Sequence, residues 1–169
     1  MGTLGPDAVT QLWREQSRAL TLYARQWCDA PEDIVQEAFL TLVRQPSAPD
    51  NPLGWIYRVV RNRAQNAGRA RRRRQSRETA AAQRRPSWFE PGHDDRLDAD
   101  AASEALQQLP DDQREAIVAR IWGGLGFDEI ARLTDASTST VYRNYRRGLR
   151  VLQERLGWKC ETSNNKTSR

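Results

Sequence analysis

The C-terminal part of the sequence carries hydroxyl and guanidinium groups at spacings that suit DNA. Thr138 and Ser139 stand at the start of a helical pattern, and arginines follow at positions 143, 146, 147 and 150. A helix start can approach phosphates or base edges with its free N–H groups, and an arginine fork can bind the edge of a guanine. The pattern therefore favours DNA binding over an amphipathic helix whose charged face only meets solvent.

Charge is strongly segregated along the chain. The 169 residues include 27 Lys+Arg and 22 Asp+Glu, a formal net charge of +5. Residues 61–85 hold ten arginines and one acid, residues 90–115 hold nine acids and two arginines, and residues 138–159 hold six basic residues and one acid. The ratio of ten arginines to one acid in residues 61–85 is too uneven for an ordinary solvated surface, so the sequence indicates a polyanionic partner.

Residues for catalysis or metal binding are scarce. His93 is the only histidine, and Cys28 and Cys160 are 132 positions apart, which builds no metal site or disulfide framework. The catalytic serine, P-loop and dinucleotide motifs are absent. No apolar run exceeds four residues, and the N-terminus lacks a signal-peptide pattern. We therefore expect a non-enzymatic cytoplasmic protein with no cofactor, no metal and no membrane insertion.

The first half of the chain is predicted to form three helices. Apolar residues recur every three or four positions over 7–27. Asp29 is expected to cap a second helix with Pro31 in its first turn, and Asn51-Pro52 signals the start of a third. Gly68 is expected to weaken that third helix by about 1 kcal/mol, and its arginine-rich end either lies over a partner or frays.

The second half repeats the helical pattern after a linker at 77–100, which we expect to be flexible because it is rich in charge and poor in aliphatic residues. The role of Trp88-Phe89 within it is open. A short helix near 127–133, a four-residue connection and a long helix from Thr138 form a helix-turn-helix pattern. No strand pattern occurs. The sequence thus predicts an all-α fold of two small helical domains joined by a flexible linker, the second ending in a helix-turn-helix, with a disordered tail at 159–169.

Two surfaces of the first half need partners of different kinds. The second helix presents an acidic and amide face, which cannot lie on DNA and must meet solvent or a protein: Glu32, Asp33, Gln36 and Glu37, with Leu40 and Arg44 further along. The third helix mixes Trp55, Tyr57, Arg58 and Asn62 before its arginines, as single-strand readers do, although Trp55 by itself is more typical of a core. Together they indicate a protein that contacts another protein and an opened duplex.

Four motifs in order resemble the bacterial RNA polymerase sigma factors, over roughly residues 7–156. Pro31 to Leu40 is similar to their D-x-V-Q-E-x-F-L helix, and Asn51 to Asn62 resembles the W-L-x-x-I-A-x-N helix that follows. Leu106 to Glu115 resembles the L-x-x-L-P-x-x-x-R-E start of their second DNA-binding domain, and residues 126–141 resemble its helix-turn-helix. The short linker points to the extracytoplasmic-function class.

The resemblance implies that residues 1–76 (region 2) bind polymerase and the −10 element, and that residues 101–158 (region 4) bind the −35 element. The residues that would dock on the clamp helices of the largest polymerase subunit are Asp33, Gln36, Glu37, Leu40 and Arg44. The loop 45–53 would capture a flipped −10 base with Arg58 and Asn62. The arginines that would hold the DNA backbone are Arg61, Arg63, Arg69, Arg71, Arg72, Arg73 and Arg74. The −35 residues would be Thr138, Ser139, Thr140, Tyr142, Arg143, Arg146, Arg147 and Arg150.

Further partners implied by the resemblance are the polymerase flap, the RNA exit channel for the acidic linker, and in some members an anti-sigma protein. Some residues depart from the family pattern: Asn66 stands where Asp is usual, Gly68 where an apolar residue is common, and Ser139 in place of Gly. Two alternatives are a stand-alone helix-turn-helix regulator, which has no use for the acidic face of the second helix, and an arginine-rich adaptor, in which residues 69–74 would carry the affinity.

Overall fold

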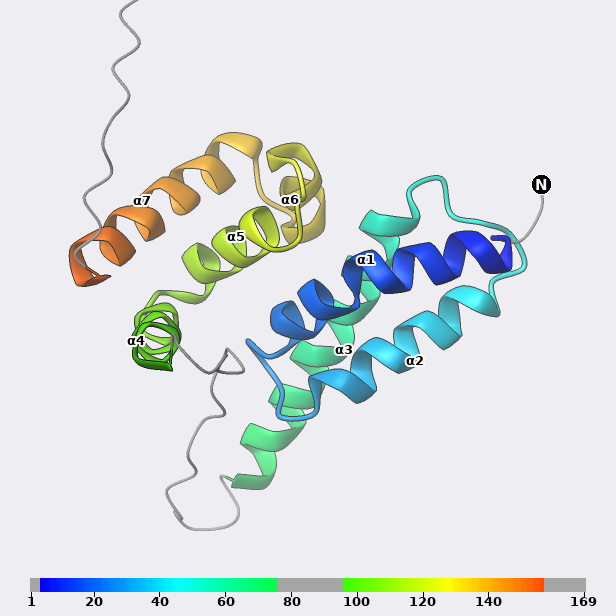
Figure 1. Ribbon diagram of the computed structural model, residues 1–169, viewed down its shortest axis with the longest axis horizontal. Coiled ribbons are helices and arrows are strands. Elements are labelled where there is room, and N and C mark those ends of the chain that lie inside the picture. The colour runs from blue at the N-terminus through cyan, green and yellow to red at the C-terminus, as the bar shows by residue number, and fades with distance from the viewer. Residues whose placement is uncertain (1–3, 76–95, 157–169) are drawn as a thin grey trace, which may run out of the picture.

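The computed structural model describes residues 4–75 and 96–156, and these ranges contain seven α-helices and no strand (Figure 1). The all-α prediction is confirmed. The predicted flexible linker, apart from residues 96–100, and the predicted disordered tail lie outside the described residues. Among the described residues, no helix is both long and apolar enough to cross a membrane.

The first domain consists of α1 (Pro6–Ala24), α2 (Pro31–Val43) and α3 (Pro52–Gln75). Each begins with a proline, whose fixed φ suits the first helical turn and whose missing N–H needs no partner there. The predicted cap of α3 is confirmed, because the Gly54 N–H donates to Asn51 Oδ1 over 2.9 Å. The predicted cap of α2 is wrong. Ala30 is the N-cap residue and makes no side-chain cap bond, while Asp29 forms an ion pair with Arg71 of α3.

The three helices bury one apolar side each. Leu20 and Tyr23 of α1, Val35 and Leu42 of α2, and Ile56 of α3 are at most 1% exposed. Trp13 of α1 packs edge-on against Phe39 of α2, with 4.8 Å between ring centroids. This core holds the outer faces of α2 and α3 in fixed positions.

The arginine-rich end of α3 is helical up to Gln75, although little apolar surface supports it. Helix α3 lies against the α1–α2 connection at Gly68, where a Cβ would approach the carbonyl oxygen of Trp27 to 2.3 Å. Gly68 is thus a point of close packing, where the sequence had suggested only a weak point in the helix.

The second domain consists of α4 (Arg96–Gln107), α5 (Asp111–Ile121), α6 (Phe127–Thr134) and α7 (Thr138–Leu156). Helix α4 begins at Arg96, five residues earlier than residue 101, where the second domain was predicted to start. Arg114, 5% exposed, ties α4 to α5 by donating to the carbonyl oxygens of Gln107 and Leu109.

The predicted helix-turn-helix is formed by α6 and α7. Asp135 ends α6 in the left-handed conformation with φ 52°, a geometry that Asp tolerates better than most residues. The Ala136 N–H then donates to the Ala131 carbonyl oxygen, and the Thr140 N–H donates to Ser137 Oγ over 3.2 Å at the start of α7. The turn therefore sets the direction in which α7 leaves the domain.

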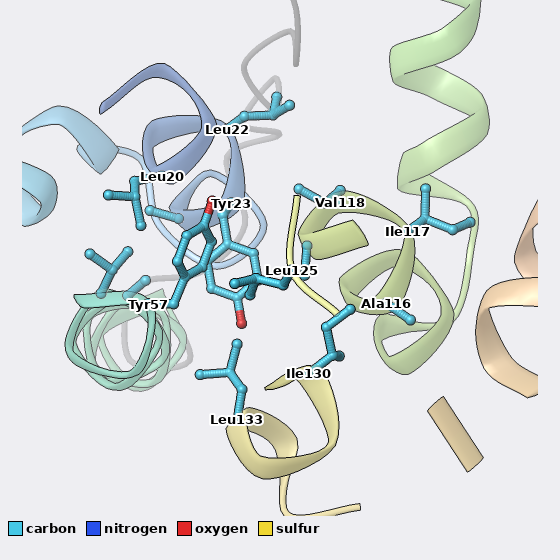
Figure 2. Close-up of a cluster of buried hydrophobic side chains, with 14 of the residues drawn as sticks. Leu20, Leu22, Tyr23, Tyr57, Ala116, Ile117, Val118, Leu125, Ile130 and Leu133 are labelled. Atoms are coloured by element: carbon cyan, nitrogen blue, oxygen red, sulfur yellow. The ribbon is translucent and has the colours of Figure 1, made fainter. Parts of the chain in front are cut away.

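The two domains pack against each other through α1 and α3 on one side and α5 and α6 on the other (Figure 1). Figure 2 shows the buried side chains at this junction, among them Tyr23 and Tyr57 from the first domain and Val118, Leu125 and Ile130 from the second. The sequence predicted two separate helical units and did not predict this contact.

Candidate nucleic-acid interface

The outer face of α2 carries four of the five predicted polymerase-binding residues, and the fifth, Arg44, is the C-cap residue of this helix. Asp33, Gln36, Glu37, Leu40 and Arg44 are exposed, and Leu40 is 54% exposed despite being apolar. Val43, three positions further, is 56% exposed and lies on the same face. Sequence reasoning missed Val43, although its spacing from Leu40 was a usable signal. The face is thus acidic at one end and apolar at the other.

Arg63 connects this face to α3. Its Nη2 donates to Thr41 Oγ1 over 2.8 Å, and its Nη1 lies 3.4 Å from Glu37 Oε2. The structure therefore brings a predicted polymerase-binding residue, Glu37, into contact with a predicted DNA-backbone residue, Arg63.

The start of α3 carries the predicted base-capturing residues. Arg58 and Asn62 are exposed and lie one turn apart on the same side of the helix. Trp55 is half-buried and, with Pro49, Asn51 and Arg58, lines a pocket of about 340 Å³ that α6 closes with Glu129, Arg132 and Leu133. Of the four residues in the predicted single-strand pattern, only Trp55 and Arg58 line this pocket. The amide there is that of Asn51, and Tyr57 is fully buried, so the prediction of Tyr57 as an exposed aromatic is wrong. The second domain covers one side of the pocket.

Arg61 is placed differently from the other predicted DNA residues. Its side chain is 20% exposed and faces Glu115 of α5, with Nε 2.7 Å from Oε1 and Nη2 3.3 Å from Oε2. Burial by itself lowers the pKa of Arg61, but the hydrogen bond and negative charge of Glu115 outweigh it and raise the pKa overall. Glu115 was not among the predicted site residues.

The remaining arginines of α3 form its far end. Arg69, Arg72, Arg73 and Arg74 are exposed, and Arg71 is half-buried in its ion pair with Asp29. The Arg69 guanidinium donates to Asn66 Oδ1 over 2.6 Å, one turn back along the helix. This end of α3 is a cationic rod suited to a DNA backbone.

The predicted −35 residues line the outer side of α7. Thr138, Ser139, Tyr142, Arg143, Arg146, Arg147 and Arg150 are exposed, and Thr140 is half-buried. Within the described part of the chain, none of these four arginines has an ion pair. Two contacts order the N-terminal end: Thr138 donates to Asp128 Oδ1 over 2.8 Å, and Tyr142 packs edge-on against Phe127. The face is thus preorganised and cationic.

The described residues offer neither a cluster of metal ligands nor an activated thiol. The described residues contain no group of three or more His, Cys, Asp or Glu that could hold a metal ion. Cys28 is buried, and burial raises the pKa of its thiol to about 11, so it is poorly suited to act as a nucleophile.

Comparison with known proteins assigns both domains. Residues 12–75 match Sigma-70 region 2, and residues 99–152 match Sigma-70, region 4. RNA polymerase sigma-H factor of Pseudomonas aeruginosa is 31% identical over 147 residues, which cover 75% of this chain and 74% of that protein. RNA polymerase sigma factor CarQ of Myxococcus xanthus is 32% identical over 134 residues, with coverage of 75% and 74%.

Further matches agree. ECF RNA polymerase sigma factor EcfG of Rhodopseudomonas palustris is 26% identical over 129 residues, which cover 73% of this chain and 70% of that protein. Among solved structures, the sigma factor RpoE in complex with the anti-sigma factor NepR from Bartonella quintana shares the fold, with a TM-score of 0.73, 23% identity, and coverage of 90% of this chain and 98% of that one. The chain therefore belongs to the RNA polymerase sigma factors of the extracytoplasmic-function (ECF) class, which direct transcription from promoters.

Proposed function

We propose that this chain binds core RNA polymerase through the exposed face of α2 and reads a promoter at two places, the −10 element with α3 and the −35 element with α7. One observation carries the proposal: the region 2 match and the region 4 match each contain an exposed arginine-rich helix face, and the first also carries an acidic and apolar face unsuited to DNA. A stand-alone regulator needs only one of these three surfaces.

On polymerase, the α2 face meets the clamp helices of the largest subunit. Asp33 and Glu37 supply negative charge at the rim of this contact, and Leu40 and Val43 supply apolar area that water otherwise covers. Region 4 contacts the flap. Because polymerase supplies the chemistry, the chain acts in the cytoplasm as a dissociable specificity subunit and carries no catalytic residue of its own.

On DNA, the loop 45–53 with Arg58 and Asn62 binds a base that has left the stack. Extruding a base costs a few kcal/mol, and the aromatic, amide and cationic groups at the start of α3 repay part of that cost. The arginines of α3 beyond this point hold the backbone. The N-terminal end of α7 enters the major groove, where Ser139, Tyr142 and Arg143 read base edges and Arg147 and Arg150 hold phosphates.

An anti-sigma protein is a further proposed partner, since a solved sigma factor of the same fold is in complex with one. It would bind the surfaces that polymerase and promoter otherwise use.

The test is transcription in vitro with core polymerase and a library of random upstream DNA, sequencing the transcribed templates. We expect two enriched elements at a fixed separation, and no transcription without the chain. Sequence-specific binding to duplex DNA with no polymerase-dependent transcript would favour the stand-alone regulator. Affinity that disappears with residues 69–74 and is indifferent to α7 would favour the adaptor.

A further inference from the structure

Tyr142 differs in kind from the other exposed residues of α7. Of the eight predicted −35 residues it is the one with an aromatic ring, whereas the other seven carry hydroxyl or guanidinium groups. Tyr142 is nevertheless 48% exposed. Hydroxyl and guanidinium groups match phosphates and polar base edges, but the apolar body of an exposed ring matches neither.

The ring of Tyr142 is held by Phe127, the first residue of α6. The two ring centroids are 5.3 Å apart and the ring planes stand at 88°, which is a favourable edge-to-face arrangement. Helices α6 and α7 pack against each other (Figure 1), so this contact joins the first turn of α6 to the second turn of α7. A side chain that is already held in place loses less conformational freedom when it binds a ligand.

Phe127 is itself fixed by its neighbours. Its ring is half-buried and packs against the ring of Tyr145, on the inner side of α7, with 5.3 Å between centroids. The guanidinium carbon of Arg120 lies 5.0 Å from the centroid of Phe127, and Arg120 also donates to the carbonyl oxygen of Leu125 over 2.9 Å. Residues from α5, from α7 and from the connection before α6 therefore set the position of the Phe127 ring.

Tyr142 lies near the end of α7 that would meet base edges. It is one turn after Thr138, where α7 begins, and one turn before Arg146, and all three residues are exposed. In a helix-turn-helix, the N-terminal residues of the second helix contact the bases in the major groove. The proposed docking of α7 thus brings the part of the ring that Phe127 does not cover close to the base edges.

The major groove offers one group that suits such a ring. Base pairs present hydrogen-bond donors and acceptors there, and thymine alone adds a methyl group. An aromatic ring gains from covering a methyl group, because apolar surface leaves water on both sides of the contact. It loses when it covers a donor or acceptor to which it offers no hydrogen bond. The ring of Tyr142 therefore favours thymine over the other three bases.

We propose that Tyr142 is the specificity-determining residue for one thymine of the −35 element, whose 5-methyl group packs on its ring, and that Phe127 is a positioning residue that holds the ring for this contact. The inference rests on the proposed function, because it requires α7 to enter the major groove of the −35 element. The recognition is apolar, so the hydroxyl of Tyr142 contributes little to the choice of base.

The test uses the full chain assembled with core polymerase. Selection from a randomised −35 library with the wild type and with Tyr142→Ala identifies the position at which a preference for thymine is lost. Synthetic duplexes then carry thymine or uracil at that position. Uracil pairs with adenine as thymine does and lacks only the 5-methyl group. Uracil in place of a thymine outside the element is the control, and fluorescence anisotropy gives the affinities.

We expect uracil at the identified position to weaken binding of the wild type about fourfold, as follows from one buried methyl group. Uracil at the control position should have no effect. Tyr142→Phe should keep the fourfold ratio, and Tyr142→Ala should bind the two duplexes equally. 5-Methylcytosine should be bound more tightly than cytosine at the same position, because it carries a methyl group in the same place. The comparison of thymine with uracil uses the wild type and so does not depend on the folding of any variant.

The role of Phe127 is tested with Phe127→Leu, which keeps an apolar side chain beside α7 but removes the ring contact. This variant should lower the ratio between the thymine and uracil duplexes to below about twofold. It should leave the preferences at the other −35 positions unchanged, which a general loss of folding would not do. Tyr145→Phe, which removes only a hydroxyl from the other ring against Phe127, is the matched control and should keep the ratio. Circular dichroism checks the helices of each variant.

The thymine contact is overturned if the wild type binds the two duplexes equally, or if Tyr142→Ala selects the same sequence as the wild type. A loss of affinity in Tyr142→Phe together with no effect of uracil also overturns it, and would assign the hydroxyl to a phosphate. An unchanged ratio in Phe127→Leu overturns the positioning role. If the wild type selects no −35 element, the proposed function fails as well, whereas an element that is selected without regard to the methyl group overturns this inference alone.

Discussion

The carbonyl oxygen of Trp27 lies so close to Gly68 that a Cβ on Gly68 would approach it to 2.3 Å. These residues are 41 positions apart, one after α1 and the other in the middle of α3. The contact lets α3 run directly against the α1–α2 connection and places its arginine-rich end beside Asp29. Because of this close contact, replacing Gly68 by a larger residue should affect stability.

Gly68→Ala should destabilise the protein by about 1–3 kcal/mol, because the methyl group overpacks against backbone. Helix propensity by itself would make the same change stabilising by about 1 kcal/mol. Ala70→Gly, at an exposed position of the same helix, is the matched control and should cost about 1 kcal/mol. Urea unfolding measures both. A more stable Gly68→Ala protein would contradict the close contact.

Charge reversal on α2 should weaken polymerase binding. We expect Asp33→Lys with Glu37→Lys to reduce affinity for core polymerase at least about tenfold, since like charges facing each other across an interface cost several kcal/mol. The fold should survive, because both residues are exposed and the Glu37–Arg63 pair at the surface contributes at most about 1 kcal/mol.

The control for this pair is Glu104→Lys with Asp112→Lys, the same charge change at exposed positions of the second domain. Fluorescence anisotropy of labelled protein titrated with core polymerase gives the affinities. An affinity of the α2 double variant equal to that of the wild type would remove α2 from the polymerase interface.

Asn62→Ala should impair transcription more on fully duplex promoters than on templates with a premelted −10 bubble. The proposed contact is with a base that has left the stack. Losing this contact should therefore reduce transcription most on templates where the protein must also stabilise the melted duplex. Asn66→Ala, the same chemical change one turn further along α3, is the control and should show a smaller difference. Equal losses of Asn62→Ala on both templates would indicate a role in folding.

Arg143 and Arg150 should behave differently when replaced by alanine. Arg143 lies near the N-terminal end of α7, and its loss should cost about 1–3 kcal/mol and relax preference at one −35 position. Arg150 lies two turns further, and its loss should weaken all sequences alike and reduce the salt dependence by about one unit of slope. Selection from a randomised −35 library at two salt concentrations measures both effects. A changed preference in Arg150→Ala together with an unchanged one in Arg143→Ala would reverse the docking orientation.

Cys28 should make the protein lose stability in mild alkali. Burial raises the pKa of its thiol from 9.0 to about 11 in the folded protein. Below pH 9 the thiol is neutral in both states and has no effect, whereas between pH 9 and 11 the unfolded chain loses its proton more readily than the folded one. Wild type should therefore lose about 2 kcal/mol over this window that Cys28→Ala does not lose. If the wild type and Cys28→Ala had parallel pH profiles of the free energy of unfolding, the pKa of Cys28 would not be raised in the folded protein.

The sequence by itself determined the helices, their order and the kinds of surface they carry. Prolines at positions 6, 31 and 52 and the Asn51 cap start helices through local sterics and hydrogen bonds, which need no distant partner. Apolar periodicity determined which side of each helix is buried, and therefore which charged residues of α2 and α7 stay exposed. The helix-turn-helix could also be predicted from the sequence, because the connection between its two helices is short and polar.

Only the tertiary structure decided which distant residues meet. Arg61 and Glu115 are 54 positions apart, and nothing local distinguishes Arg61 from the exposed arginines that follow it. Asp29 looked like a helix cap, but the end of α3 brings Arg71 within reach, and an ion pair replaces the cap. Pairings of this kind depend on how whole helices pack against one another, because the partner's position is set by side chains far away in the chain. The apolar periodicity that predicts a helix contains no information about which distant residue will lie beside it.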